Sequence, residues 1–210
     1  MASEDLLKLG DQVSIRVARP QDAARLSEIC LLTGDSGSDA SDMYQHKEML
    51  GDIYLHPYLK YESDLAFVLV KGEEPVGYVI GALDTNVFAD LMNSQWFPGL
   101  RDKYAPFVSS FNEHEAELWE LIQEPFSLDP QVLERYPSHL HIDLLPSVQG
   151  SGYGRFMMAV LLEALRSAGS RGVHLGISRS NVGAGRFYEK VGFQVLSEDD
   201  TGLVYGLDLT

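Results

Sequence analysis

The segment QGSGYGR, Gln149 to Arg155, places three glycines within five residues just before a long apolar run. Glycine leaves the backbone bare, and a loop that leads into a helix points several unpaired N–H groups at one place. The positive end of the helix dipole adds to these groups, so the segment suits an anion, with a pyrophosphate as the natural ligand. Glycine also forms tight turns that hold no ligand, so both interpretations stay open. The spacing matches neither G-x-x-x-x-G-K-[ST] nor G-x-G-x-x-G, which disfavours both of those nucleotide-binding classes.

Candidates for proton transfer lie on the segment that precedes this loop. His139, His141 and Asp143 alternate in HLHIDLL, so on a strand their side chains share one face. Asp143 and His141 suit a general base and a substrate anchor. A strand with one solvated face carries the same alternation without any function, and that alternative stays open.

Composition and length limit the class of protein. The chain has 210 residues, 45% of them hydrophobic, and we expect one domain with an elaboration. Its longest apolar runs fall far short of the roughly 20 residues that a membrane span needs, and the N-terminus, MASEDLLKLG, carries acids where a secretory signal carries positive charge. We therefore expect a soluble, cytoplasmic protein. The single cysteine, Cys30, cannot form an internal disulfide and suits a buried helix position.

The charge is unevenly distributed along the chain. The formal net charge is -15, yet residues 149–190 carry six basic side chains against two acidic ones. An acidic chain with one basic segment binds nucleic acid poorly, whereas that segment suits a small phosphorylated ligand. The acidic remainder favours a cationic partner, although acids also serve only to keep a protein in solution.

The elements that must position these residues alternate along the chain. Apolar periodicity predicts two antiparallel strands joined by the turn GEEP, a strand that ends in HLHIDLL, a long helix after the glycine loop, and a second short helix near the C-terminus. About fifty residues of mixed helical character, broken by prolines, separate the strands before HLHIDLL; we expect a helical insertion at 86–137. The expected elements are strands at 13–17, 65–71, 76–83, 139–145, 173–177, 193–196 and 203–209, and helices from 20, near 45–50, at 153–168 and at 183–191.

Two ordered signatures resemble the GNAT acetyltransferase superfamily. The coenzyme loop of that family follows Q/R-x-x-G-x-G/A, and Gln149, Gly152 and Gly154 occupy its fixed places. The segment SNVGAGRFYEKVGF, residues 180–193, is similar to the second signature. The resemblance implies a mixed α/β fold with a mostly antiparallel, splayed sheet, and acetyl-CoA as cosubstrate without a metal.

A narrower resemblance concerns GYVIGALDT, SQWFP, YPSHLHIDLL and ALRSAGSRGV. These segments are similar to the acetyltransferase-like domain at the C-terminal end of eukaryotic O-GlcNAcases and to its separate bacterial homologues. In vertebrate members the coenzyme loop is degenerate, whereas here it is intact. A chain of 210 residues taken up by this domain leaves no room for a sugar-cleaving barrel of about 250 residues, so we expect no hydrolase function.

The family resemblance assigns the coenzyme contacts. It implies that backbone amides of the loop hold the pyrophosphate, and that main-chain N–H groups at the end of the preceding strand bind the pantetheine arm and polarise the acetyl carbonyl. Asn181 matches a position that touches the coenzyme arm, and a role as a turn residue is an equal alternative. The implied contacts are Leu144, Leu145, Gln149, Gly150, Ser151, Gly152, Tyr153, Gly154, Arg155 and Asn181.

The same resemblance assigns the acid and suggests an acceptor site. Tyr188 matches the family tyrosine near the coenzyme sulfur, which implies a general acid. Asp84 suits an ammonium and Trp96 a cation–π contact; the alternatives are a helix cap for Asp84 and packing of the insertion for Trp96. We expect N-acetylation of a basic acceptor, namely a lysine peptide, a polyamine or an amino sugar. The competing hypothesis is a pseudo-acetyltransferase that binds acetyl-CoA or a protein partner without turnover.

Overall fold

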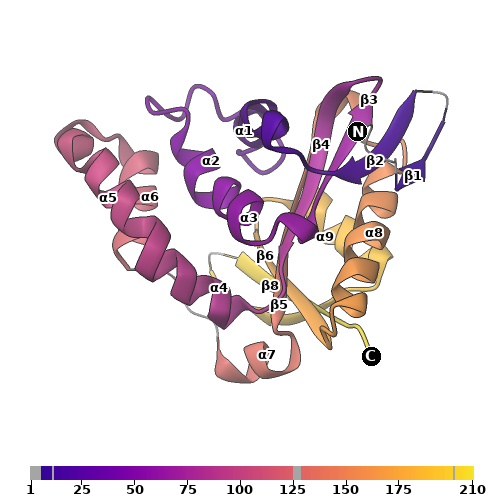
Figure 1. The fold of residues 1–210 in the computed structure, drawn as a ribbon. Coiled ribbons are helices and arrows are strands. Elements are labelled where there is room, and N and C mark those ends of the chain that lie inside the picture. Colours follow the sequence, from indigo (N-terminus) through magenta and orange to yellow (C-terminus); the bar gives the residue numbers. More distant parts are fainter. Residues whose placement is uncertain (1–5, 11, 125–128, 201) are drawn as a thin grey trace.

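The computed structural model describes residues 6–10, 12–124, 129–200 and 202–210. Within these residues a mixed eight-stranded sheet in the order β1-β2-β3-β4-β5-β6-β8-β7 lies between two layers of helices (Figure 1). The strands are β1 (Leu7–Lys8), β2 (Val13–Val17), β3 (Ala66–Lys71), β4 (Glu74–Ala82), β5 (Ser138–Leu144), β6 (Gly172–Ser178), β7 (Gln194–Glu198) and β8 (Gly202–Asp208). The helices are α1 (Ala23–Leu32), α2 (Met49–Tyr54), α3 (His56–Tyr61), α4 (Thr85–Leu91), α5 (Phe97–Tyr104), α6 (Glu113–Gln123), α7 (Pro130–Arg135), α8 (Tyr153–Ser167) and α9 (Val182–Val191).

The strand pairing confirms the mixed, mostly antiparallel sheet. The sheet is open at one place, between β5 and β6. β3 and β4 form the expected antiparallel hairpin, and β4 pairs antiparallel with β5. β5 and β6 run parallel but pair only at Ser138 with Val173 and at His139 with His174. Beyond these pairs the two strands diverge, so the backbone of β5 toward Leu144 has no strand partner on its β6 side.

The two faces of the sheet carry separate cores. α1, α2, α3, α5 and α6 cover one face, and α8 and α9 cover the other (Figure 1). Side chains alternate along a strand, so Leu140 and Ile142 of β5 face α8, and the odd-numbered residues of β5 face the helices of the first layer. His139, His141 and Asp143 therefore share one face, as the alternation predicted.

Helices occupy the chain between β4 and β5, where the sequence predicted a helical insertion at 86–137. Asp84 Oδ1 accepts from the backbone N–H groups of Asn86 and Val87 and so caps α4. Asn112 and Glu115 form a reciprocal capping box at the start of α6. Residues 125–128 of this segment, like the acidic residues 1–5, lie outside the described residues.

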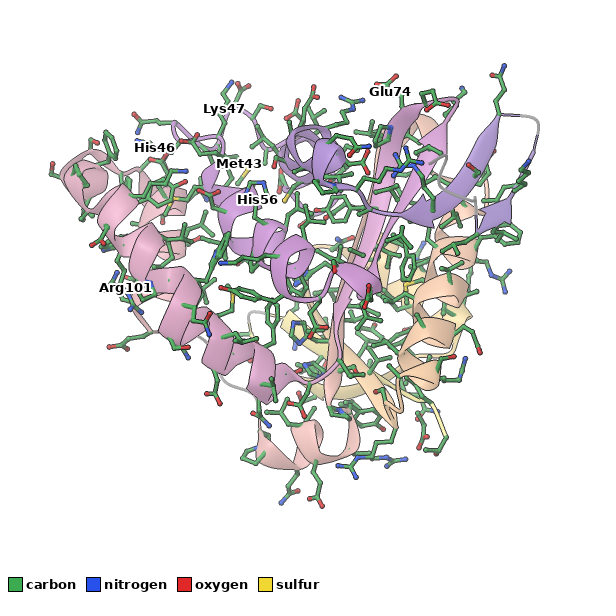
Figure 2. All side chains as sticks on the ribbon, viewed as in Figure 1. Met43, His46, Lys47, His56, Glu74 and Arg101 are labelled. Atoms are coloured by element: carbon green, nitrogen blue, oxygen red, sulfur yellow. The ribbon has the colours of Figure 1, made fainter. Side chains whose placement is uncertain are left out.

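Hydrogen bonds connect α6 to the loop that precedes α2. The carboxylate of Glu115 is fully buried and accepts from the backbone N–H of His46 at 2.7 Å, with His46 Nδ1 at 3.0 Å. Figure 2 shows His46 and Met43 on this loop, beside the helices of the first layer. The expected helix near 45–50 begins later, at Met49, because the buried side chains Met49, Leu50 and Ile53 lie on that turn. None of the helices in the described residues combines the length and apolar character needed to cross a membrane.

Candidate active site

A cleft of about 1290 Å³ opens where β5 and β6 diverge. Its glycine-loop end is lined by the loop before α8 and by the first turns of α9, including Gly150, Gly152, Arg155, Asn181 and Tyr188. Its helical end is lined by α1, α2, α6 and the loop between α1 and α2, including Cys30, Tyr44, Tyr54, Glu117 and Leu121. The half-buried face of β5 that carries His141 and Asp143 also lines the cleft.

The three glycines of the loop have different structural roles. Gly150 (φ 72°) and Gly152 (φ 83°) adopt left-handed conformations that a side chain rarely tolerates, so they form the turn itself. At Gly154 the backbone is ordinary, but an added Cβ would lie 3.1 Å from the ring of Phe187. The third glycine therefore lets α8 approach α9, and only the first two shape the loop.

The N-terminus of α8 faces the cleft without a side-chain cap. Gly152 is the N-cap residue and provides no side chain to accept from the first-turn N–H groups. Gln149 Nε2 donates to the carbonyl of Leu144 at 2.8 Å, which ties the loop to the end of β5. Open N–H groups, the helix dipole and Arg155 at the cleft wall together suit a negatively charged group.

The end of β5 presents one free amide where the sequence predicted two. The N–H of Leu145 donates to the carbonyl of Val76 at 3.0 Å, and Leu145 does not line the cleft, so its amide is not available to a ligand. Hydrogen-bonding directions alternate along a strand, so the N–H of Leu144, one residue earlier, points away from β4 and into the opening. Leu144 lines the cleft. Of the two predicted coenzyme contacts, the Leu145 amide is therefore used within the sheet, which corrects that prediction, and the Leu144 amide remains a candidate.

Asp143 lies deep in the cleft. Burial raises the pKa of its carboxyl from 3.8 to about 6, and the nearby hydroxyls of Tyr78 and Thr33 limit that rise. Asp143 as a whole residue is half-buried, and it lines the cleft. At neutral pH the group is mainly ionised, yet it is a much stronger base than an ordinary aspartate.

His141 and His139 are connected behind the cleft through one tyrosine. The hydroxyl of Tyr58 lies 3.0 Å from His141 Nε2 and 2.8 Å from His139 Nε2. Burial lowers the pKa of His141 to about 4 and that of His139 well below its usual value. Both imidazoles are therefore neutral at physiological pH. His141 lines the cleft, whereas His139 and Tyr58 do not.

Tyr188 lines the same cleft as Asp143. Its side chain is only 6% exposed, and its ring contacts those of Phe187, Phe193 and Tyr205. Burial and the negative charge of Asp143 raise the pKa of its phenol well above 10, so the hydroxyl keeps its proton. The structure thus brings Tyr188 of α9 to the same cleft as His141 and Asp143 of β5.

The remaining predicted residues are divided between the cleft and the scaffold. Asn181 lines the cleft and also caps α9, since its Oδ1 accepts from the N–H of Ala184 at 3.0 Å. Asp84 does not line the cleft and caps α4. Trp96 does not line it either: its Nε1 donates to the carbonyl of Asp52 at 2.7 Å, and its ring packs beside Tyr61. Both side chains thus occupy the structural positions that were the alternatives to ligand binding.

The helical end contains residues that sequence reasoning missed. Glu117 is exposed there, and Tyr44 and Tyr54 line the same end of the cleft; burial and, to a smaller extent, the charge of Glu117 raise the pKa of both phenols. Glu117 is one of several acids on the expected helix NEHEAELWELIQ, and nothing in the spacing separates it from the others. In the described residues no group of three or more His, Cys, Asp or Glu side chains is placed to hold a metal ion.

Comparisons with known proteins agree with this geometry. The model of the Acetyltransferase (GNAT) family matches residues 37–193. Protein O-GlcNAcase of Rattus norvegicus and of Mus musculus are each 28% identical over 181 residues, covering 85% of this chain but 20% of theirs. The chain thus spans about a fifth of the length of these curated relatives.

Solved structures extend the comparison. The crystal structure of SsHAT is 33% identical, with a TM-score of 0.86, and the match covers 95% of this chain and 99% of that one. The Salmonella typhimurium protein yncA, solved with its cofactor acetyl-CoA, is 15% identical over 95% of each chain, with a TM-score of 0.55, which shows a shared fold.

Proposed function

The chain belongs to the GNAT acetyltransferase family, and we propose that it transfers the acetyl group of acetyl-CoA directly to an amine of a basic acceptor: a lysine peptide, a polyamine or an amino sugar. One observation carries the proposal. One cleft joins an uncapped helix N-terminus to a helical end that carries Glu117 and aromatic rings, and both Asp143 and Tyr188 line it.

The glycine-loop end fits acetyl-CoA. The left-handed turns at Gly150 and Gly152 bare the backbone beside the first turn of α8, where N–H groups would hold the pyrophosphate. The N–H of Leu144 lies at the open edge of β5 and would hold the pantetheine arm or the acetyl oxygen. Bound there, acetyl-CoA supplies an acetyl group activated as a thioester.

Asp143 and Tyr188 would move the two protons of the reaction. The Asp143 carboxylate takes a proton from the acceptor ammonium, and the freed lone pair attacks the acetyl carbon. A C–N bond forms as the C–S bond breaks, and the Tyr188 hydroxyl donates its proton to the departing sulfur. The attacking nitrogen then gives its second proton to the Tyr188 phenolate, which restores the hydroxyl, and exchange with water removes the first proton from Asp143.

The chemistry of Cys30 supports direct transfer. It is the only cysteine of the chain, and it lies at the wall of the cleft. Its side chain is 5% exposed, and burial raises the pKa of its thiol to about 12. A thiol with this pKa is almost entirely protonated at neutral pH, so it is a poor nucleophile for an acetyl-cysteine route.

The helical end favours a positively charged acceptor. Glu117 and the aromatic rings of Tyr44 and Tyr54 line it, and carboxylates and ring faces both attract ammonium groups. Among the described lining residues, Arg155 is the only lysine or arginine, and it belongs to the glycine-loop end. An ammonium at the helical end therefore meets a carboxylate and no lysine or arginine.

Glu117→Gln is expected to raise KM for a cationic amine about fivefold with little change in kcat, because an exposed ion pair contributes up to about 1 kcal/mol. Steady-state kinetics with a diamine and an uncharged aromatic amine measure the effect, which should be confined to the diamine. Glu120→Gln on the same helix is the matched control, since Glu120 is exposed but does not line the cleft. Equal effects of both variants would reject Glu117 as an acceptor contact.

Binding and turnover can be tested separately. Acetyl-CoA at about 100 times its Kd stabilises the folded state by about 2.7 kcal/mol, which raises Tm by roughly 5–10 °C for a chain of this size. Gly152→Val should remove the shift because valine rarely adopts the left-handed conformation at this position. No shift in the unchanged protein would reject coenzyme binding. A shift without thiol release from any amine would instead favour the pseudo-acetyltransferase hypothesis.

A further inference from the structure

A chain of hydrogen bonds runs behind the cleft from the backbone to His141. The hydroxyl of Thr85 lies 2.7 Å from the carbonyl of Pro137 and 2.7 Å from His139 Nδ1. His139 Nε2 lies 2.8 Å from the hydroxyl of Tyr58, which lies 3.0 Å from His141 Nε2. Tyr58 is 4% exposed, and neither it nor Thr85 lines the cleft.

The backbone carbonyl gives this chain a single direction. A carbonyl only accepts, so at 2.7 Å the hydroxyl proton of Thr85 must lie on the bond to Pro137. The Thr85 oxygen then accepts from His139, which places the proton of that imidazole on Nδ1. Since burial keeps His139 neutral, its Nε2 is unprotonated and accepts from Tyr58.

The same accounting determines the tautomer of His141. The only proton of the Tyr58 hydroxyl is used toward His139, so its oxygen accepts from His141 Nε2–H. His141 is neutral because burial lowers its pKa to about 4, and Nδ1 therefore carries a lone pair. In the described residues this nitrogen has no hydrogen-bond partner, and His141 lines the cleft.

We propose that Tyr58 and Thr85 are positioning residues that hold His141 as its Nε2–H tautomer, so that Nδ1 is a permanent hydrogen-bond acceptor for the incoming amine. This proposal rests on the proposed function only in taking the ligand of Nδ1 to be the acceptor amine. Asp143 lies two residues further along the same face of β5. The floor of the cleft thus offers two acceptors, Asp143 for the N–H whose proton is transferred and His141 for a second N–H that orients the nitrogen.

The tautomers can be read directly in the free protein. In the full chain labelled with 15N-histidine, long-range 1H–15N correlation spectra at pH 7.5 should show opposite neutral tautomers for two residues of one strand. His139 should carry its proton on Nδ1 and His141 on Nε2, with signals assigned from His139→Gln and His141→Gln. A cationic His141, a proton on its Nδ1 or an averaged signal would overturn the proposal.

Thr85 provides a matched pair of variants. Thr85→Val removes the hydroxyl that gives the chain its direction, so the His141 signals should shift toward a mixture of tautomers and kcat/KM for the amine should fall about fivefold. Thr85→Ser keeps the hydroxyl and should restore both the single tautomer and the rate. A valine variant with the unchanged His141 tautomer would reject Thr85 as a positioning residue.

Two tyrosines of α3, Tyr58 and Tyr61, provide a second matched pair of variants. Tyr58→Phe breaks the chain at its middle and should also mix the His141 tautomers, raising KM for the amine more than KM for acetyl-CoA. Tyr61→Phe is the control, because the buried Tyr61 hydroxyl has no hydrogen-bond partner among the described residues. Equal kinetics for the two variants would overturn the positioning role. The expected tautomers without acetylation of any amine would instead reject the proposed function alone.

Discussion

Asp143→Asn is expected to lower kcat/KM for amine acetylation roughly 10²- to 10⁴-fold, the range of a positioned general base. Asparagine keeps the shape of the side chain but cannot take the proton of the ammonium. The Kd for acetyl-CoA, measured by thermal-shift titration, should be unchanged, because the contacts proposed for the coenzyme lie on Leu144 and the glycine loop. Stopped-time assays of thiol release measure the rate.

The pH profile tests the same assignment. Burial raises the pKa of Asp143 to about 6, so the carboxylate is protonated and inactive below that pH. Log kcat/KM should rise with a slope near one as pH increases toward 6 and then level off. This limb should be absent in Asp143→Asn. If the limb survives in the variant, another group titrates near pH 6 and Asp143 is not the base.

Stability provides the control for misfolding. A raised carboxyl pKa means that the folded state favours the neutral form, so the stability it contributes is present below the unfolded pKa of 3.8 and is lost as pH rises through about 6. Asparagine cannot ionise, so at pH 8 Asp143→Asn should gain up to about 3 kcal/mol, at 1.36 kcal/mol per pKa unit. Urea denaturation measures this gain. A variant that is both inactive and less stable than the unchanged protein would contradict this account.

Tyr188→Phe is expected to lower kcat about 10²-fold or more while leaving the Kd for acetyl-CoA unchanged. The phenol is neutral at any physiological pH and lines the cleft. We expect kcat to fall because phenylalanine has no hydroxyl proton to donate to the departing sulfur. The defect should shrink with acetyl donors whose thiol is more acidic, because such a thiolate leaves without a proton. Steady-state kinetics with two donors of different thiol pKa measure this.

Tyr205→Phe is the matched control for Tyr188. The two rings contact each other, with centroids 6.2 Å apart, and both side chains are buried, but Tyr205 does not line the cleft. Its variant should therefore keep the rate. An equal defect in both variants, or a Tyr188→Phe defect that does not depend on the donor thiol, would show that the aromatic packing matters and the phenolic proton does not.

Local patterns predicted most of the fold. The turn GEEP between two β-rich runs indicated the β3–β4 hairpin, which the pairing confirms. The glycine loop before a long apolar run indicated the β5–loop–α8 unit. The start of α2 was misplaced because its boundary depends on which side chains, such as Met49 and Ile53, become buried against other elements.

The site was less accessible to sequence reasoning. Both Leu144 and Leu145 were expected to offer amides, but the pairing register of β4 with β5 uses the Leu145 N–H and leaves that of Leu144. A register is a relation between two strands, and one strand alone does not reveal it. Trp96 was a candidate acceptor contact because of its residue type, and its position against Asp52 and Tyr61 depends on packing.

The sequence by itself determined what short-range geometry controls: the left-handed turns at Gly150 and Gly152, the helix that follows them, and the shared face of His141 and Asp143. The tertiary structure decided which distant segments meet at that face. It brings Glu117 to the cleft and places Tyr58 behind it, and it raises the pKa of Asp143 by burial. The physical reason is that desolvation and hydrogen-bond direction depend on everything that surrounds a side chain, whereas spacing records only its neighbours along the chain.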